Sequence, residues 1–145
     1  MSQKIINHQM IIDGKYTNSI TEKTVEIECP ANKRIFATVP RGNEADVDIA
    51  VKSSLKAFRS WSKVMPKERG KILLQIADAI EIEKEDIAKI IATETGNAIK
   101  TQARPEINLV VDIFRYFGGL SSELKGETIP LGEHVLSYTR REPLG

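Results

Sequence analysis

The sequence is poor in the residues that build disulfides, metal sites and aromatic platforms. It has one cysteine, two histidines and only 6% aromatic residues among 145 positions. A single cysteine, Cys29, excludes an internal disulfide and favours a reducing compartment. The two histidines, His8 and His134, lie near opposite ends of the chain and match no metal-binding spacing. No apolar run approaches a membrane span, and the N-terminus is too polar for a signal peptide. We therefore expect a cytoplasmic protein with no membrane partner.

An excess of charge of one sign is also missing. Lys and Arg number 21 against 20 Asp and Glu, so the net charge is +1. Binding to phosphate backbones requires a clustered basic excess, which excludes nucleic acid as the main partner. Hydrophobic residues make up 41% and charged residues 28%, a composition typical of a soluble globular domain with a real core.

The N-terminal third predicts a small antiparallel β unit. The first seven residues are expected to form a flexible tail (1–7). Asp13-Gly14 is the pair that a type I′ hairpin turn prefers, because both central residues need a positive φ. Pro30 to Lys33 reads as a second turn, between two strands with alternating patterns. The expected strands are Met10–Ile12, Lys15–Tyr16, Thr24–Cys29 and Arg34–Val39.

The central part predicts three to four helices. Asn43 is placed to cap the first helix, and Pro66 fits the first position of the second. The charged run from Glu81 to Glu85 indicates a bend or break, and Thr95 to Asn97 indicates a helix end. A third helix is expected from Pro105. The first helix carries an apolar stripe, expected to be buried: Val47, Ala50, Val51, Leu55, Phe58 and Trp61.

The C-terminal part predicts two extended pieces, Thr128–Leu131 and Val135–Glu142. The stretch from Tyr138 to Gly145 reads as a strand whose far edge needs a partner. The glycines of Gly126–Gly132 suggest a phosphate-binding loop, but such a loop must open a helix. Here an extended pattern follows, so the turn interpretation is favoured.

No complete chemical site emerges from these residues. Cys29 precedes Pro30 at a strand end, without a nearby histidine or helix N-terminus to activate its thiol, and a packing role is the better interpretation. The aromatics fall on helical stripes and are expected to be core residues: Phe58, Trp61, Phe114, Tyr116 and Phe117. Taken alone, the residues describe an α/β scaffold without a site.

Several segments, in order, resemble the N-terminal region of the NAD(P)-dependent aldehyde dehydrogenase superfamily. Each is weak by itself, but together they are in register from about Met10 onward. They are Ile12–Tyr16, Cys29–Asn32, Ala37–Pro40, Asp46–Asp48 with Ala50-Val51, Trp61, Glu68-Arg69, Glu94–Gly96, Arg115–Gly119, Gly126–Pro130 and Tyr138–Gly145.

The resemblance implies an aldehyde dehydrogenase-like α/β fold, present as an N-terminal fragment with β-hairpins, three to four helices and a terminal arm strand. Residues 8–132 would belong to the cofactor-binding domain. Residues 133–145 would begin the oligomerisation arm and pair with another subunit in a homo-oligomer. In the complete enzyme, a thiolate attacks a small-molecule aldehyde, hydride passes to NAD or NADP, and a glutamate activates the water that releases a carboxylic acid.

The family's catalytic machinery is expected beyond the position of Gly145. The Pro-Trp-Asn stretch, the Gly-x-Thr-x-x-Gly cofactor loop, the general-base Glu and the Cys nucleophile are all missing here. After Gly126 and Thr128 the next glycine comes one residue too late. We therefore expect no catalytic residue, no cofactor binding by this chain alone and no activity. An alternative is a non-catalytic module that pairs with a full-length relative through its terminal strand.

One minor site is implied by the resemblance. Many members hold a structural monovalent cation with backbone carbonyls before the Asn-Pro-Ala turn and a carboxylate before Thr-Gly. The corresponding positions are Ile27, Glu28 and Glu94. Here Glu94 stands where Asp is common, and Cys29 replaces the usual Asn.

Overall fold

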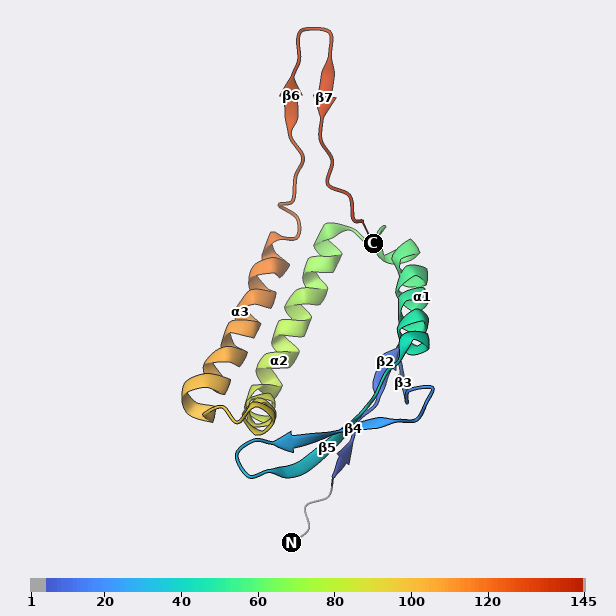
Figure 1. Cartoon of the computed structure of the whole chain (residues 1–145). Helices are drawn as coiled ribbons and strands as arrows, with labels where there is room; N and C mark the ends of the chain where they lie inside the picture. The colour runs from blue at the N-terminus through green and yellow to red at the C-terminus, as the bar shows by residue number, and fades with distance from the viewer. Residues whose placement is uncertain (1–4, 145) are drawn as a thin grey trace.

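The computed structural model describes residues 5–144 and has the mixed α/β architecture expected from the sequence. Figure 1 shows a β region at one end, two long neighbouring helices, a separate helix and a projecting hairpin. The strands are β1 (Ile6–Asn7), β2 (Met10–Ile12), β3 (Lys15–Thr17), β4 (Thr24–Cys29), β5 (Arg34–Pro40), β6 (Thr128–Pro130) and β7 (Leu136–Tyr138). The helices are α1 (Glu44–Trp61), α2 (Pro66–Thr95), the π-helical η1 (Ile99–Ala103) and α3 (Arg104–Leu120).

The N-terminal strands form two small sheets. Strands β2 and β3 make the predicted hairpin, in which Asp13 and Gly14 have φ values of 53° and 71°. The other sheet has the order β1-β5-β4. Ile6 and Asn7 of β1 pair in parallel with β5, so the prediction of a flexible tail over 1–7 is wrong for these two residues. Residues 1–4 of that predicted tail lie outside the described residues.

Helix α1 begins with the predicted Asn43 cap. The Asn43 side chain accepts from the backbone N–H of Asp46 at 3.1 Å, and the Asp46 carboxylate accepts from the Asn43 N–H at 2.9 Å. This reciprocal capping box satisfies two otherwise orphaned donors. Asp46 is buried and also accepts from the Ile20 N–H at 2.9 Å. The cap therefore ties the start of α1 to the loop before β4.

The prediction that the apolar stripe of α1 is buried is wrong. Val47, Val51, Leu55 and Trp61 are all exposed. Helix α1 makes its main contact with β2 and does not pack along α2 or α3. The three- and four-residue spacing of the apolar residues correctly predicted the helix. No other element of the described chain, however, covers its apolar face.

Helix α2 runs without interruption from Pro66 to Thr95, so the predicted break at Glu81 to Glu85 is wrong. These carboxylates are held by arginines of α3 rather than repelling one another. Arg115 binds Glu81, and Arg104 binds both carboxylate oxygens of Glu85 at 3.0 Å and 2.9 Å. No glycine or proline interrupts the run, so nothing forces the backbone to leave the helical path.

Helices α2 and α3 pack closely because glycines meet where they approach. A Cβ on Gly70 would lie 2.6 Å from the Gly118 carbonyl oxygen and would also strike the Ser121 hydroxyl. The described core lies toward the other end of the pair, where η1 leads into α3 just before Pro105. Its buried members are Ala88, Ala103 and Ile107, and the packed neighbours are Ile80, Ile87, Ile91, Ala92, Ile99 and Val110.

The C-terminal part forms a hairpin that projects beyond the helices (Figure 1). Strand β7 pairs antiparallel with β6, so one edge of the terminal strand has a partner within the chain. The regular strand ends at Tyr138, shorter than the predicted Val135–Glu142. The predicted boundary between 132 and 133 falls in the connection of this hairpin. We call β6, β7 and their connection the arm.

Candidate functional site

The predicted cation position lies where β4 and the end of α2 meet. Gly96 caps α2 in the left-handed conformation, with φ 75°. A Cβ on Gly96 would lie 3.2 Å from Pro30, the residue that follows β4. The structure thus brings the end of α2 against the turn after β4, and α2 contacts β4 itself.

The three predicted cation ligands have different surroundings. Ile27 pairs with Ala37, whereas Glu28 pairs with Ile35, so the ladder shifts register between Ile27 and Glu28. Such a bulge disturbs the backbone pairing and can free a carbonyl. The Glu28 carboxylate forms an ion pair with Lys33 at 3.2 Å, and Glu94 is exposed. The backbone arrangement is compatible with carbonyl ligands, and the cation site stays a prediction.

Other metal or thiol chemistry finds no support in the part of the chain that the structure describes. Within residues 5–144 no group of three His, Cys, Asp or Glu side chains is placed to hold a metal ion. Cys29 is a buried free thiol at the end of β4. Its burial agrees with the packing interpretation, since reactive thiols are partly exposed beside positive charge.

The segment Gly126–Gly132 lies at the base and first strand of the arm, not before a helix. The Glu127 N–H donates to the Thr139 hydroxyl, and the Thr139 N–H donates to the Glu127 carbonyl, both at 2.9 Å. A Cβ on Gly126 would collide with the Thr139 backbone. Gly126 therefore permits the close approach of the two arm segments, and the residues present do not fit a dinucleotide phosphate.

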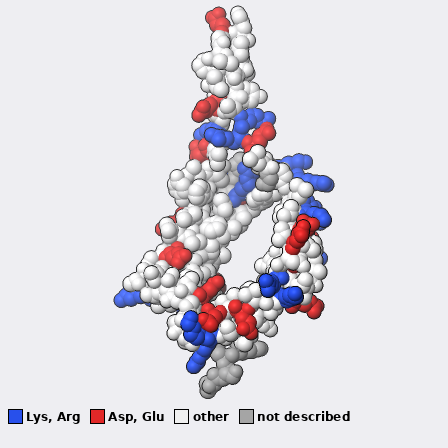
Figure 2. Space-filling view, viewed as in Figure 1, with Lys and Arg blue, Asp and Glu red and all other residues white. Residues whose placement is uncertain are grey.

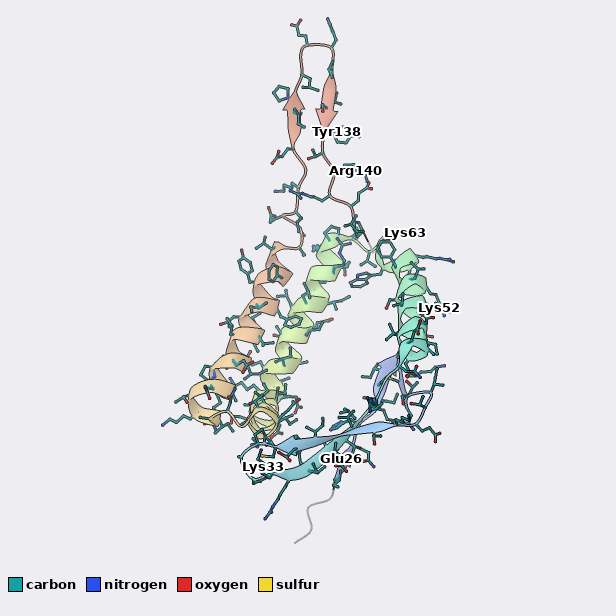
Figure 3. The ribbon with its side chains drawn as sticks, in the orientation of Figure 1. Glu26, Lys33, Lys52, Lys63, Tyr138 and Arg140 are labelled. Atoms are coloured by element: carbon teal, nitrogen blue, oxygen red, sulfur yellow. The ribbon has the colours of Figure 1, made fainter. Side chains whose placement is uncertain are left out.

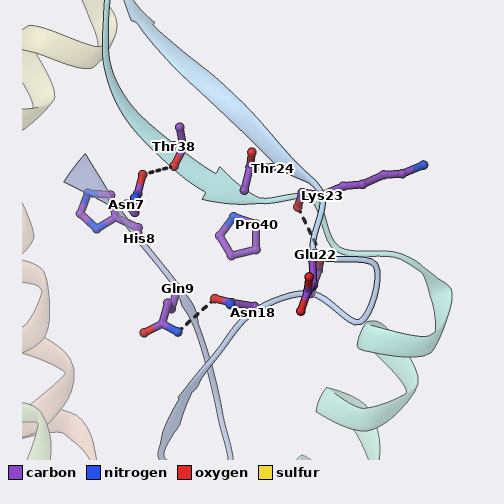
Figure 4. Close-up of a pocket in the computed structure, with 10 residues that line it drawn as sticks. Asn7, His8, Gln9, Asn18, Glu22, Lys23, Thr24, Thr38 and Pro40 are labelled. Carbon is purple, nitrogen blue, oxygen red and sulfur yellow. Dashed lines mark hydrogen bonds between the residues drawn. The ribbon is translucent and has the colours of Figure 1, made fainter. Parts of the chain in front are cut away.

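Sequence reasoning missed a polar groove beside the N-terminal sheet, drawn in Figure 4, with a volume of about 370 Å³. Its side chains largely bind one another. The Thr38 hydroxyl donates to the Asn7 side chain at 2.8 Å, and the Gln9 amide donates to the Asn18 side chain at 3.0 Å. No short motif could have indicated the groove, because distant segments build it. These mutual hydrogen bonds engage four of the polar side chains that line the groove.

A second groove, also of about 370 Å³, lies where the chain after the arm returns to the helices. Phe58 and Trp61 come from the end of α1, and Arg69 from the start of α2. Arg69 donates to the Val64 carbonyl at 2.6 Å, so its guanidinium fixes the α1–α2 connection. Arg141 and Pro143 complete the rim.

Residues 5–144 bring together no group of three metal-ligating side chains, and comparison with known proteins shows which fold family they form. The model of the aldehyde dehydrogenase family matches residues 16–145. This chain belongs to the aldehyde dehydrogenase family. The match extends over nearly the whole sequence, which confirms the resemblance found in its motifs.

Solved structures of aldehyde dehydrogenases show the same fold. An NAD⁺ complex of the aldehyde dehydrogenase from Bacillus cereus is 33% identical with a TM-score of 0.91, covering 94% of this chain and 28% of that chain. An NAD-dependent aldehyde dehydrogenase from Sinorhizobium meliloti is 30% identical with a TM-score of 0.84, covering 90% and 26%. A betaine aldehyde dehydrogenase variant from Staphylococcus aureus, in complex with NAD⁺, is 28% identical with a TM-score of 0.84, covering 89% and 26%.

This aldehyde dehydrogenase chain thus spans about a quarter of the length of the solved relatives it matches. It corresponds to an N-terminal portion of the family's fold, as the motif order predicts. None of the helices within residues 5–144 is both long enough and apolar enough to cross a membrane.

Proposed function

We propose that this chain is the N-terminal part of an NAD- or NADP-dependent enzyme that oxidises an aldehyde to a carboxylic acid. The observation that carries the proposal is the family match over residues 16–145. Relatives solved with NAD⁺ support a nicotinamide cofactor in the complete enzyme. The single cysteine, which is a free thiol, supports a cytoplasmic location.

The chain is inactive by itself under this proposal. Its only thiol, Cys29, is buried at a strand end, and Gly126 lies at the base of the arm rather than at a helix N-terminus. The nucleophile, the general base and the cofactor loop would come from the part of the fold that the chain lacks. Its own contribution is to fix the outer helices and the arm against which that part folds.

An assay of the purified chain tests this proposal. NADH or NADPH formation is followed with a panel of aliphatic, aromatic and amino aldehydes, with a complete relative as positive control. We expect no turnover above the buffer blank and no binding of NAD⁺ by calorimetry. Turnover at ordinary enzymatic rates would show that the chain carries a catalytic site of its own.

The arm supports a second candidate function, a non-catalytic module that pairs with another subunit or a full-length relative. Strands β6 and β7 form a two-stranded sheet, so each keeps one edge free for strand addition. Leu131, Val135, Leu136 and Tyr138 expose apolar surface on this hairpin. Homo-oligomerisation through residues 133–145 belongs to the same proposal.

Copurification and sedimentation test whether the chain associates through the arm. We expect the chain to co-elute with a complete relative or with itself, and Leu136→Lys to weaken that association while the fold is retained. Leu136 is 81% exposed, so the lysine disturbs no packing within the chain. A wild-type chain that is strictly monomeric and does not co-elute with the relative would contradict this candidate function.

We also propose the structural monovalent cation at Ile27, Glu28 and Glu94. Replacing K⁺ or Na⁺ by choline at constant ionic strength should lower the melting temperature of the wild-type chain. Glu94→Gln should remove that dependence, because its amide carries no charge to bind the ion. Equal melting temperatures in all three salts would exclude the site in this chain.

A further inference from the structure

The chain has six aspartates, and Asp13 is the one that lies outside a helix. In a helix, the N–H that follows an aspartate is hydrogen-bonded to the carbonyl four residues earlier. The Val47 N–H, for example, donates to the Asn43 carbonyl at 3.1 Å. The five helical aspartates are Asp46, Asp48, Asp78, Asp86 and Asp112. Only Asp13 is therefore followed by a backbone N–H that no helix holds.

Asp13 and Gly14 form the two-residue turn of the β2–β3 hairpin. Both have positive φ, 53° and 71°. Within residues 5–144, the Gly14 N–H donates to no backbone carbonyl of a turn or loop. A Cβ on Gly14 would have no atom within 4 Å. The backbone nitrogen of Gly14 is thus free of both hydrogen bonding and crowding, and the turn has room to rotate.

Two contacts with α1 hold the Asp13 carboxylate. The Ser53 hydroxyl donates to it at 3.4 Å, and the Lys56 ammonium lies 3.9 Å away. The Asp13 side chain is still 60% exposed. Figure 3 draws the hairpin beside α1, the helix that carries the labelled Lys52. These contacts tie the turn to α1, which makes its main contact with β2.

The surroundings of the turn are hydrated. Figure 2 shows acidic and basic side chains on the outer edge of the molecule, over α1 and the neighbouring strands. Charged side chains keep such a surface in contact with water. A reaction that needs water as a reagent can therefore take place at this turn in the folded chain.

We propose that Asp13–Gly14 is a site of spontaneous isomerisation to isoaspartate, and that this change releases the β2–β3 hairpin from α1. The Gly14 nitrogen attacks Cγ of the Asp13 carboxyl group. The carboxyl OH leaves with the amide hydrogen as one water molecule, which closes a five-membered succinimide. The inference goes beyond the proposed function and does not depend on it.

One water molecule then opens the succinimide at either carbonyl carbon. Cleavage of the bond between Cγ and the Gly14 nitrogen restores aspartate. Cleavage of the original peptide bond leaves the chain connected through Cγ, which is isoaspartate. The water lost in the first step is regained in the second, so no oxidant, reductant or cofactor is consumed.

Isoaspartate changes both features that place the hairpin. The backbone gains one carbon in a two-residue turn whose length sets the register of β2 and β3. The free carboxylate moves to Cα, away from the position at which Ser53 and Lys56 meet it. The hairpin therefore loses its exact pairing together with its polar contacts to α1.

The experiment incubates the full chain at neutral pH in water enriched in the heavy oxygen isotope. Peptide mapping by mass spectrometry follows, with fragment spectra that assign the label to a residue and distinguish isoaspartate from aspartate. We expect the peptide that holds Asp13 to take up heavy oxygen and to split into two chromatographic forms. Its labelling should be at least ~10-fold faster than that of any helical aspartate, because a helical amide must open first.

Asp13→Glu is the matched control variant. It keeps the carboxylate, but closure on the Gly14 nitrogen would require a six-membered ring, so we expect no label at this position. Asp48, which is exposed on α1, is the internal control in the wild-type sample and needs no variant to fold. The absence of label at Asp13 of the folded chain would overturn the site, as would equal labelling of Asp48 or of Asp13→Glu.

Hydrogen exchange of the isomerised form, separated by chromatography, tests the release of the hairpin. Amides of β2 and β3 should exchange faster than in the unmodified chain, whereas those of α2 and α3 should keep their protection. Identical exchange in both forms would overturn the release from α1. Faster exchange throughout the chain would also overturn it, because the change would then be global.

Discussion

Helices α1 and α2 have similar apolar periodicity, but their apolar faces differ in burial. The stripe of α2 that meets α3 is closed over Ala88 and Ile107, whereas Leu55 and Trp61 of α1 remain open. The difference lies in the neighbours, because α3 returns alongside α2 and nothing in the described chain returns alongside α1. Periodicity therefore tells which face of a helix is apolar, but not whether this chain buries it.

The largest expected loss of stability comes from a substitution in the core between α2 and α3. Ile107→Ala should lower the free energy of unfolding by about 2–4 kcal/mol, because it leaves a cavity between α2 and α3. Leu55→Ala, on the open stripe, should change it by less than about 0.5 kcal/mol. Urea denaturation followed by circular dichroism measures both. Similar losses for the two variants would mean that α1 is packed in solution.

The glycine contact between α2 and α3 is the next target. Gly70→Ala should cost about 1–3 kcal/mol, since the methyl group would meet the Gly118 carbonyl and the Ser121 side chain. Gly119→Ala is the control, with no atom within 4 Å of the added methyl. It should leave stability unchanged or raise it, because alanine favours a helix over glycine. A Gly70→Ala variant with the same melting temperature as the wild-type chain would contradict the close approach of α2 and α3.

The start of α1 should respond less strongly. Asp46→Ala removes the acceptor for the Asn43 and Ile20 N–H groups and should cost about 1–2 kcal/mol. Asp48→Ala, exposed on the same helix, should have little effect. Hydrogen exchange would show the loss as faster exchange in the first turn of α1, and uniform protection in both variants would contradict it.

The exposed ion pair between α2 and α3 should give the smallest effect, and one that depends on pH. Hydrogen bonds from Arg104 lower the pKa of the Glu85 carboxyl from its ordinary value of 4.5. The pair therefore stabilises the fold above that ordinary value, and the contribution is lost as pH falls through the lowered pKa. Glu85→Gln should be slightly less stable than the wild-type chain at pH 7 and equal to it at pH 2.

Glu83→Gln, an exposed residue of the same helix, is the control for this titration. It should follow the wild-type chain at both pH values. Urea midpoints at pH 7 and pH 2 give the comparison, and exposed pairs of this kind are weak because water and salt screen them. A Glu85→Gln deficit that persists at pH 2 would show that the residue acts through packing rather than charge.

Local signals in the sequence were reliable where one residue type satisfies one backbone requirement. Asp13 and Gly14 adopt the positive φ values of the predicted turn, Asn43 caps α1, and Pro66 begins α2. Each outcome depends on the residue and its immediate neighbours. These signals, with the motif order, were enough to predict the fold class and the family.

Predictions failed where a distant segment decided the outcome. The charged run of Glu81 and Glu85 predicted a break in the helix. In the structure, Arg115 and Arg104 of α3 bind these carboxylates and the helix continues. Ile6 and Asn7 form a strand only because Thr38 and Ala37 lie alongside. The polar groove could not be foreseen for the same reason, since its side chains come from distant segments.

The sequence by itself determined the helix starts, the turns and the family, because these follow from residue identity and spacing. The tertiary structure decided which apolar faces are buried. Burial depends on which elements return to the same place, and no local pattern encodes that. For α1 the result is an apolar face that the described chain leaves exposed.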